Sequence, residues 1–387
     1  MITDIRKITV LYRDIPTGTL QLDPGSGACV FEYDKSWLAN GFSLSPTELP
    51  LKPGIFIADK ERFNGYFATF QDSLPDGYGL YLLQRMLRKQ GTALEELSPL
   101  QLLSIIGKSG MGALSYVPVI NEFQMHKEVC DDNSLDDLQE KALAVLSEKE
   151  TGDESLLYYD SANSGGARPK VAYKSNKGTH WIIKFRHTYD TPDAGKQELQ
   201  YMTTARECGI NIPRVGLIKD KYFAIERFDI TPDGKRNHVL TAAALLKTNF
   251  RDQSADYTNL LALTGYLTQD PVQVEEMFRR MVANIVMNNK DDHAKNFSFI
   301  CREGTWELAP AYDITYSPKG TRGEHATSLY YDGNPSLELI LKAGEQIYIK
   351  KERCLEIIHQ VQKACTENLD IERLRLLGPF SCPKYSM

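Results

Sequence analysis

Residues 288–297 read Asn-Asn-Lys-Asp-Asp-His-Ala-Lys-Asn-Phe, and Asp313 follows farther along the chain. Upstream, Asp270 can cap and Pro271 can open a helix, because proline suits the first helical position. Apolar residues recur at helical spacing from Val274 to Ile285, and asparagine tolerates the left-handed conformation that ends helices. The sequence therefore predicts a helix that ends near residue 288 and leads into a loop carrying the aspartates and the histidine.

A β-hairpin is predicted directly after this loop. The chain alternates like a strand over residues 297–300, turns at Gly304 and returns over residues 305–308. Asn296 and Asp313 lie eight and nine residues either side of Gly304. We therefore expect the hairpin to bring these two side chains near one another at its open end.

These residues form the pattern of a phosphoryl-transfer site. Carboxylate and amide oxygens suit Mg²⁺, which usually keeps positions for water and phosphate. In kinases, an aspartate, an asparagine five residues later and a second aspartate after a hairpin orient the substrate hydroxyl and hold the metal. Asp291 is thus the candidate base, and Asn296 and Asp313 are the candidate metal ligands. The competing interpretation is a solvated turn, in which such residues also gather.

A glycine-rich loop supplies a second set of candidate residues. It runs from Ser161 through Gly165 and Gly166, and strands are predicted at 171–173 and 181–185. Glycine lets backbone N–H groups approach phosphates because no Cβ intervenes, although such a loop is more often a plain hairpin. Lys184 lies on an apolar strand, where a kinase places the lysine that neutralises the α- and β-phosphates. Glu198, on the next predicted helix, is its candidate partner, although a helix glutamate is more often solvated.

Taken together, the motifs resemble those of the HipA family of bacterial toxin kinases. Five of them fall in the family's order along nearly the whole chain. They are the turn Leu74-Pro75-Asp76, the loop Gly166-Ala167-Arg168-Pro169-Lys170, the strand ending at Lys184, the hinge Glu226-Arg227-Phe228-Asp229, and the catalytic loop Asp291-x-His293-Ala294-Lys295-Asn296 with Tyr312-Asp313 after it.

The resemblance implies an α+β, two-lobed protein-kinase-like fold with a strand-rich N-terminal region and a mostly helical C-terminal lobe. The predicted domains are a β-rich N-terminal subdomain at 1–120, a kinase N-lobe with the loop and hinge at 121–229, and a helical catalytic lobe at 230–387. An antiparallel meander of strands is predicted at 8–12, 18–22 and 29–33, and a surface link is predicted at 121–132. Helices are predicted after residue 240, the first at 240–246 and the last at 370–377. This distribution agrees with the division.

The resemblance to the HipA family also implies roles for the site residues, with ATP and Mg²⁺ as the cofactors. Asp291 would accept the proton of the substrate hydroxyl, and Asn296 and Asp313 would hold Mg²⁺. Lys184 and the loop Gly165-Gly166-Ala167-Arg168-Pro169-Lys170 would bind phosphates. The main chain around Glu226, Arg227 and Phe228 would contact adenine, and His293, Ala294, Lys295 and Tyr312 would line the nucleotide.

Further expectations concern partners and control. The resemblance implies a protein serine/threonine kinase toxin with a small HipB-like DNA-binding antitoxin, DNA contact only through that antitoxin, and an aminoacyl-tRNA synthetase as a plausible substrate. Family members are silenced by phosphorylation of a loop serine. Asn163 occupies that register position here, so Ser164 and Ser161 are the candidate autophosphorylation sites.

The composition of the whole chain bears on nucleic-acid binding, disulfide bonds and membrane location. A formal charge of −6 gives no general electrostatic case for nucleic acid, and seven scattered cysteines without a Cys-x-x-Cys pair fit reduced thiols. We expect a cytoplasmic protein without a membrane partner, because the sequence shows neither a membrane-length apolar run nor a signal peptide. Gly107-Lys108-Ser109 is not a Walker loop, since Leu102 occupies the required glycine position.

Three other function classes stay open at this point. A small-molecule phosphotransferase would use the same aspartate and asparagine. A metal-dependent nuclease could use Asp291, Asp292, His293 and Asp313. A non-enzymatic regulatory or DNA-binding module would bind no ATP.

Overall fold

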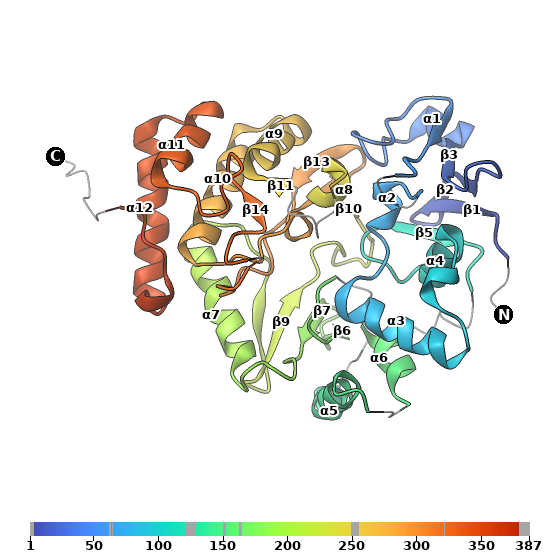
Figure 1. The fold of residues 1–387 in the computed structure, drawn as a ribbon, viewed down its shortest axis with the longest axis horizontal. Helices are drawn as coiled ribbons and strands as arrows, with labels where there is room; N and C mark the ends of the chain where they lie inside the picture. The colour runs from blue at the N-terminus through green and yellow to red at the C-terminus, as the bar shows by residue number, and fades with distance from the viewer. Residues whose placement is uncertain are drawn as a thin grey trace. The chain divides into compact units, whose positions relative to one another are not determined.

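This structure, a computed structural model, describes residues 4–61, 63, 65–120, 129, 131–149, 152–161, 165–248, 255–320 and 322–378 (Figure 1). The chain forms two compact units. The first contains Met1–Lys196, Gly216–Leu240 and Ile300–Thr305, and the second contains Gln197–Val215, Thr241–Phe299 and Trp306–Met387. The predicted division at residues 120 and 229 stays a prediction.

The elements of the first half of the chain are β1 (Lys7–Tyr12), β2 (Ile15–Leu22), β3 (Cys29–Tyr33), α1 (Lys35–Asn40), β4 (Ile55–Ile57), α2 (Ala68–Gln71), α3 (Gly77–Lys89), the 3-10 helix η1 (Leu94–Glu96), α4 (Pro99–Ile106), β5 (Leu114–Val117), α5 (Ser134–Leu146), α6 (Glu154–Asp160), β6 (Lys170–Lys174) and β7 (His180–Lys184). Those of the second half are α7 (Ala194–Glu207), β8 (Val215–Ile218), β9 (Tyr222–Glu226), β10 (His238–Thr241), α8 (Ala242–Leu246), β11 (Ala255–Asp256), α9 (Tyr257–Thr268), α10 (Pro271–Val286), η3 (Ala294–Asn296), β12 (Ser298–Arg302), β13 (Thr305–Leu308), β14 (Thr327–Ser328), α11 (Leu337–Gln346), α12 (Lys351–Asn368) and η4 (Ile371–Arg373).

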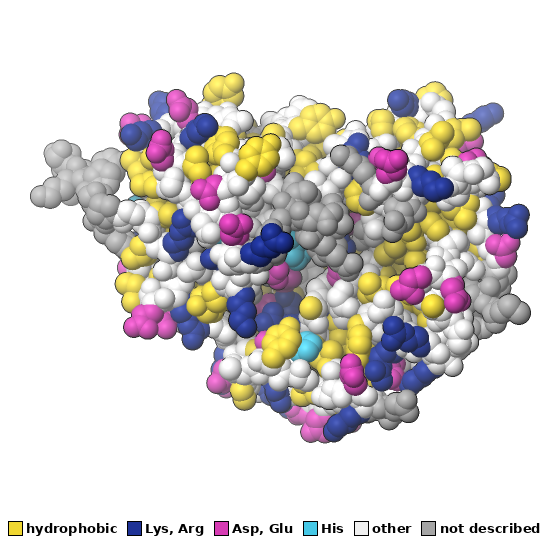
Figure 2. All heavy atoms as spheres, in the orientation of Figure 1, with side chains coloured by type: hydrophobic (Ala, Val, Ile, Leu, Met, Phe, Trp, Pro, Cys, Tyr) yellow, Lys and Arg dark blue, Asp and Glu magenta, His cyan; other side chains and the backbone are white. Residues whose placement is uncertain are grey.

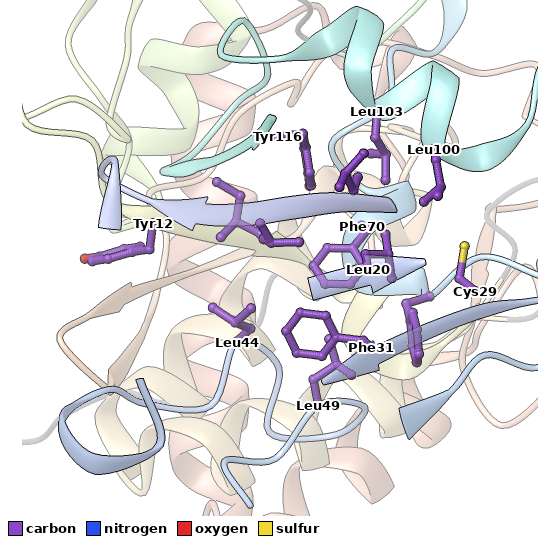
Figure 3. Packing of buried hydrophobic residues seen from close by; sticks show 14 of the residues in the cluster. Tyr12, Leu20, Cys29, Phe31, Leu44, Leu49, Phe70, Leu100, Leu103 and Tyr116 are labelled. Carbon is purple, nitrogen blue, oxygen red and sulfur yellow. The ribbon is translucent and has the colours of Figure 1, made fainter. Parts of the chain in front are cut away.

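The predicted N-terminal meander is confirmed as an antiparallel five-stranded sheet in the order β4-β3-β2-β1-β5. Arg13 and Asp14 both have positive φ between β1 and β2, as a tight two-residue hairpin requires. Alternating strand residues such as Leu20 and Phe31 point into one core, where Phe70 and Leu103 of neighbouring helices cover them (Figure 3). Burial of these side chains holds this sheet together.

A second sheet, of order β6-β7-β9-β8, carries the glycine-rich loop at its edge. Val171 and Ile183 of this sheet share a core with Tyr78 and Leu83 of α3 and with Leu157 of α6. Helix α3 also packs directly against α6 (Figure 1). A helix from the first hundred residues is therefore part of the core beneath the loop.

Helix α10 is the buried centre of the second unit and begins as predicted. The Asp270 carboxylate accepts the N–H of Val272 at 2.9 Å, and Pro271 occupies the first turn. Helices α9 and α12 pack against α10. The predicted hairpin is confirmed as β12–β13, where Glu303 and Gly304 both have positive φ.

Two predicted helices differ from the structure, and one helix was not predicted. Residues 240–246 were expected to be helical, but His238–Thr241 forms β10 and the Thr241 hydroxyl caps a helix that starts only at Ala242. Residues 370–377 were also expected to be helical. They form only η4, because Arg375 N–H donates to Val286 O and Leu377 N–H to Gln362 Oε1, which holds the chain extended. Helix α6 was not predicted, and the link expected at 121–132 falls largely outside the described residues.

Among the helices of the described residues, none combines the length and the apolar character that a membrane crossing requires.

A buried ion pair follows β9. Arg227 donates two hydrogen bonds to the Asp229 carboxylate, at 2.6 and 2.9 Å, and both side chains are almost fully buried. The N–H of Gly112 donates to the same carboxylate at 3.0 Å. Burial alone would raise the pKa of Asp229, but Arg227, Arg236 and this N–H outweigh it and lower the pKa to about 2.

We predict that this pair makes stability depend on pH below 4. Because the folded pKa lies below the ordinary value of 3.8, Asp229 stabilises the fold above about pH 4, and this contribution disappears as the pH falls through about 2. Asp229→Asn should lower the free energy of unfolding by about 3–5 kcal/mol at pH 7, since it leaves the buried Arg227 unpaired. In urea titrations the difference in the free energy of unfolding between wild type and variant should shrink from pH 4 to pH 2. A constant difference would contradict the assignment.

Candidate active site

The loop after α10 is tied to a later segment of the chain through its backbone. Asn288 has φ +52, the left-handed conformation predicted for the helix end. Lys290 N–H then donates to Ser317 O at 3.0 Å, and Lys290 O accepts the N–H of Ala326 at 3.1 Å. The loop is thereby fixed on both sides before it reaches the aspartates.

Asp292 is the buried anchor of this loop. Its carboxylate accepts hydrogen bonds from Tyr257 Oη at 2.6 Å, His325 Nδ1 at 2.9 Å and Thr327 N–H at 3.3 Å, and its side chain is fully buried. Because a carboxylate only accepts, His325 must carry its proton on Nδ1. Burial and the Asp292 charge raise the pKa of Tyr257 far above its usual range, so Tyr257 stays a donor.

The anchor continues into α10 through two asparagines. Asn284 Nδ2 donates to Tyr257 Oη at 3.0 Å, and Asn289 Nδ2 donates to Asn284 Oδ1 at 2.9 Å. Asn289 Nδ2 also lies 3.3 Å from Asp313 O, as a second acceptor. One polar network therefore joins the helix, the loop and the segment at residue 313.

Asp291 has the opposite environment. Its side chain is 66% exposed, and its Oδ1 lies 3.9 Å from His293 Nε2. Its backbone carbonyl accepts a hydrogen bond from Asn296 Nδ2 at 2.8 Å. The position of Asp291 is thus fixed by the main chain, while its carboxylate remains accessible to a substrate.

The structure brings the two arms of the hairpin mouth together at Tyr312, and the closeness of the Asn296 and Asp313 side chains stays a prediction. Tyr312 Oη donates to Lys295 O at 2.7 Å and contacts Ser298 Oγ at 2.5 Å. Asn296 lines a small cavity with Tyr312 and Ile314, the neighbours of Asp313 on either side. Asp313 itself has φ +56, in the left-handed region that aspartate enters more readily than most residues.

The donor atoms at this mouth fit Mg²⁺. The amide nitrogen of Asn296 is used on Asp291 O, so its Oδ1 is the end that can face a cation. Asn289 Oδ1, in the same cavity, is buried and accepts no hydrogen bond from any described residue. The described residues contain no cluster of three His, Cys, Asp or Glu side chains suited to a metal. Mg²⁺ at this mouth stays a prediction.

Two lysines of the first unit face one another across β6 and β7. Lys170 pairs directly with Lys184 in the antiparallel register, so both side chains lie on the same face of the sheet. Lys170 is 4% exposed and its ammonium donates to Gly165 O, while Lys184 Nζ lies 5.6 Å from the Phe223 ring centre. Binding of a phosphate group by these two lysines stays a prediction.

Two of the predicted nucleotide-binding residues, Arg168 and Arg227, have side-chain partners within the protein, and their contacts with nucleotide stay predictions. Arg168 forms two hydrogen bonds with Asp190, at 2.8 and 3.0 Å. Arg227 is buried with Asp229, and its N–H donates to His180 O at 2.9 Å. These side chains stabilise the fold around the site.

The remaining predicted nucleotide-binding positions lie in the loop before β6 and at the end of β9. Ala167 and Pro169 lie in the loop leading to β6, and Pro169 O accepts the N–H of Phe185 at 2.8 Å. Glu226 ends β9 and Phe228 is half-buried after it. Their contacts with adenine, and the pairing of Lys184 with Glu198, stay predictions.

Gly166 and Ser161 of the glycine-rich loop region both form hydrogen bonds within the protein. The N–H of Gly166, which we expected to face phosphate, donates to Asp76 at 2.6 Å. Ser161 is buried and its hydroxyl donates to Tyr158 O at 2.8 Å, so it does not suit an acceptor in this conformation. Ser164 lies outside the described residues.

Sequence reasoning missed the network behind the loop. Tyr257 and His325 lie 35 and 33 residues from Asp292, and no local spacing connects them. The only signal was Asp292 itself, which we had assigned to the nuclease alternative. That assignment is wrong, since the Asp292 carboxylate is buried and occupied by three donors.

Comparison with known proteins shows which family the chain belongs to. Residues 162–369 match the family model of the HipA-like C-terminal domain, and residues 8–117 match that of the HipA N-terminal domain. The chain belongs to the HipA family. It is similar to the HipA serine/threonine-protein kinase toxin of Shewanella oneidensis, with 23% identity over 78% of this chain and 73% of that protein. It is also 27% identical to the putative kinase Y4dM of Sinorhizobium fredii, over 43% of this chain and 44% of that protein.

The fold agrees with the HipA family. The structure is similar to HipA of Shewanella oneidensis, solved with HipB and operator DNA, with a TM-score of 0.70, 18% identity, and coverage of 96% of this chain and 92% of that chain. The predicted α+β kinase-like fold is thus confirmed. The match with Y4dM spans less than half of that putative kinase.

We predict opposite outcomes for the two neighbouring aspartates. Asp292→Asn should lower the free energy of unfolding by about 2–4 kcal/mol, because the amide cannot accept from every buried donor now facing the carboxylate. Asp291→Asn, the matched control, should change it by no more than about 0.5 kcal/mol, since Asp291 is exposed. Urea unfolding at pH 7 checks both. Equal destabilisation by the two substitutions would contradict the anchor.

Proposed function

We propose that this chain is an ATP- and Mg²⁺-dependent protein serine/threonine kinase and the toxin of a toxin–antitoxin pair. The main support is the arrangement of the loop: an accessible Asp291, a buried Asp292 that fixes it, and Asn296 bonded to the Asp291 carbonyl. Similarity to a protein named as a serine/threonine-protein kinase toxin adds to this.

In this proposal Asp291 orients the serine or threonine hydroxyl of the substrate and accepts its proton. A bond forms between the hydroxyl oxygen and the γ-phosphorus of ATP, while the bond from that phosphorus to the leaving oxygen of ADP breaks. Lys170 and Lys184 bind phosphate oxygens by charge. Asn296 and Asp313 would hold Mg²⁺, which neutralises phosphate charge when bound.

The proposed partner is a HipB-like antitoxin that binds DNA. The Shewanella oneidensis HipA was solved with HipB and operator DNA, and this chain is similar in fold. Basic and acidic side chains are interspersed on the face drawn in Figure 2, and DNA contact is proposed only through the partner. An aminoacyl-tRNA synthetase is the proposed protein substrate, and the cytoplasm the proposed location.

We predict that Asp291→Asn abolishes phosphoryl transfer while ATP still binds, because the phosphate and metal contacts remain. Radiolabelled ATP with cell lysate measures transfer to protein, and calorimetry measures binding. Asp332→Asn is the matched control, since Asp332 is also an exposed aspartate of the second unit and should leave transfer unchanged. Chelation of Mg²⁺ should stop transfer by the wild type. Label in small molecules alone would indicate a small-molecule phosphotransferase, and wild-type turnover by Asp291→Asn would refute the role of Asp291.

The proposed self-inhibition now rests on Ser164 alone. Ser164 lies six residues before Lys170 in the sequence, and a phosphate there adds up to two negative charges to the predicted phosphate-binding loop and should weaken ATP binding. Mass spectrometry of the purified wild type should find phosphate on Ser164 and none on Ser161, and Asp291→Asn should lack it. Equal phosphate in the inactive variant would remove autophosphorylation from the account.

A further inference from the structure

The turn at the start of α3 holds the peptide group of Gly166 at both of its polar ends. The Asp76 carboxylate accepts the Gly166 N–H at 2.6 Å, and Tyr78 N–H donates to Gly166 O at 3.0 Å. The first of these bonds involves a charge and lies at the short end of the usual range. Gly166 is thus fixed by residues about ninety positions earlier in the chain.

The glycines at this contact are required by close approach of the two backbones. A Cβ on Gly77 would lie 2.4 Å from Gly166 O and 2.8 Å from Ala167 N, and Gly77 has φ +46. A Cβ on Gly165 would lie 3.0 Å from Asp76 Oδ1. Asp76 is itself only 8% exposed. The turn and the loop therefore fit together only because side chains are missing on both sides.

Helix α3 also fixes the chain on the other side of the loop. Arg85 Nη2 lies 2.9 Å and Lys89 Nζ 2.6 Å from the carboxylate of Glu154, whose side chain is 1% exposed. Glu154 begins α6, which ends at Asp160 just before the loop. Helix α3 and the turn before it thus contact α6 ahead of the loop and Gly166 within the loop.

We propose that Asp76 is a positioning residue for nucleotide binding, which holds the glycine-rich loop so that Lys170 and Lys184 meet the phosphates of ATP. This inference rests on the proposed function. It gives the N-terminal domain, matched over residues 8–117, a direct part in the nucleotide site. The Gly166 N–H then serves to order the loop in advance, which lowers the entropy cost of binding.

The test compares Asp76→Ala with Asp76→Asn and with Gly77→Ala. Asp23→Ala is the matched control, since Asp23 also accepts a backbone N–H in an N-terminal turn, at 2.7 Å from Ser26 N. Hydrogen exchange of the Gly166 amide is measured without nucleotide, and KM for ATP and kcat are measured with Mg²⁺. Melting temperatures confirm that each variant is folded.

Asp76→Ala should raise both the Gly166 exchange rate and the KM for ATP by about tenfold or more, while kcat changes less than about threefold. Asp76→Asn, which keeps a neutral acceptor, should fall between wild type and alanine. Gly77→Ala should act like Asp76→Ala, and Asp23→Ala should match wild type. If Asp76→Ala does not fold, Asp76→Asn and Gly77→Ala carry the test.

Unchanged exchange and KM in the folded Asp76 variants would overturn the proposal. A lower KM would also overturn it, because Asp76 would then compete with phosphate. A wild type that binds no ATP would refute the proposed function and with it the nucleotide role of Asp76. The exchange measurement alone would then still show whether Asp76 holds Gly166.

Discussion

The burial of the Asp292 carboxylate is the constraint on which the candidate site depends. Three donors from Tyr257, His325 and Thr327 converge on it, and none of them comes from the loop itself. Because Asp292 is held inside, the adjacent Asp291 is held outside, with its carbonyl bound by Asn296. A reactive carboxylate gains a fixed position in this way without losing access to solvent.

The same principle operates in the first unit with a different residue. Gly166 has no side chain to fix it, so its backbone is bound by Asp76 and Tyr78. Lys170 and Lys184 are paired in the register of β6 and β7, and the ammonium of Lys170 donates to Gly165 O of the same loop. In both units, groups proposed for chemistry are placed by buried polar contacts from distant parts of the chain.

Local sequence signals predicted much of this arrangement. The Asp270 cap, the left-handed Asn288 and the turn at Gly304 depend on neighbouring residues only, and all three are confirmed. The partners of Asp292, Gly166 and Arg227 were not predicted, because tertiary packing selects them. The sequence predicted that the Gly166 N–H faces phosphate. In the structure this N–H donates to the carboxylate of Asp76, a residue ninety positions away that no local pattern connects with the loop.

The central claim is that Asn296 and Asp313 together hold the metal of a phosphoryl-transfer site. Crystals grown with Mn²⁺ and a non-hydrolysable ATP analogue test it most directly, because Mn²⁺ is located by its anomalous scattering. The account predicts an anomalous peak within about 2.5 Å of both Asn296 Oδ1 and the Asp313 carboxylate, in contact with nucleotide phosphate. A peak on other side chains, or bound nucleotide without any Mn²⁺ at these two residues, would contradict it.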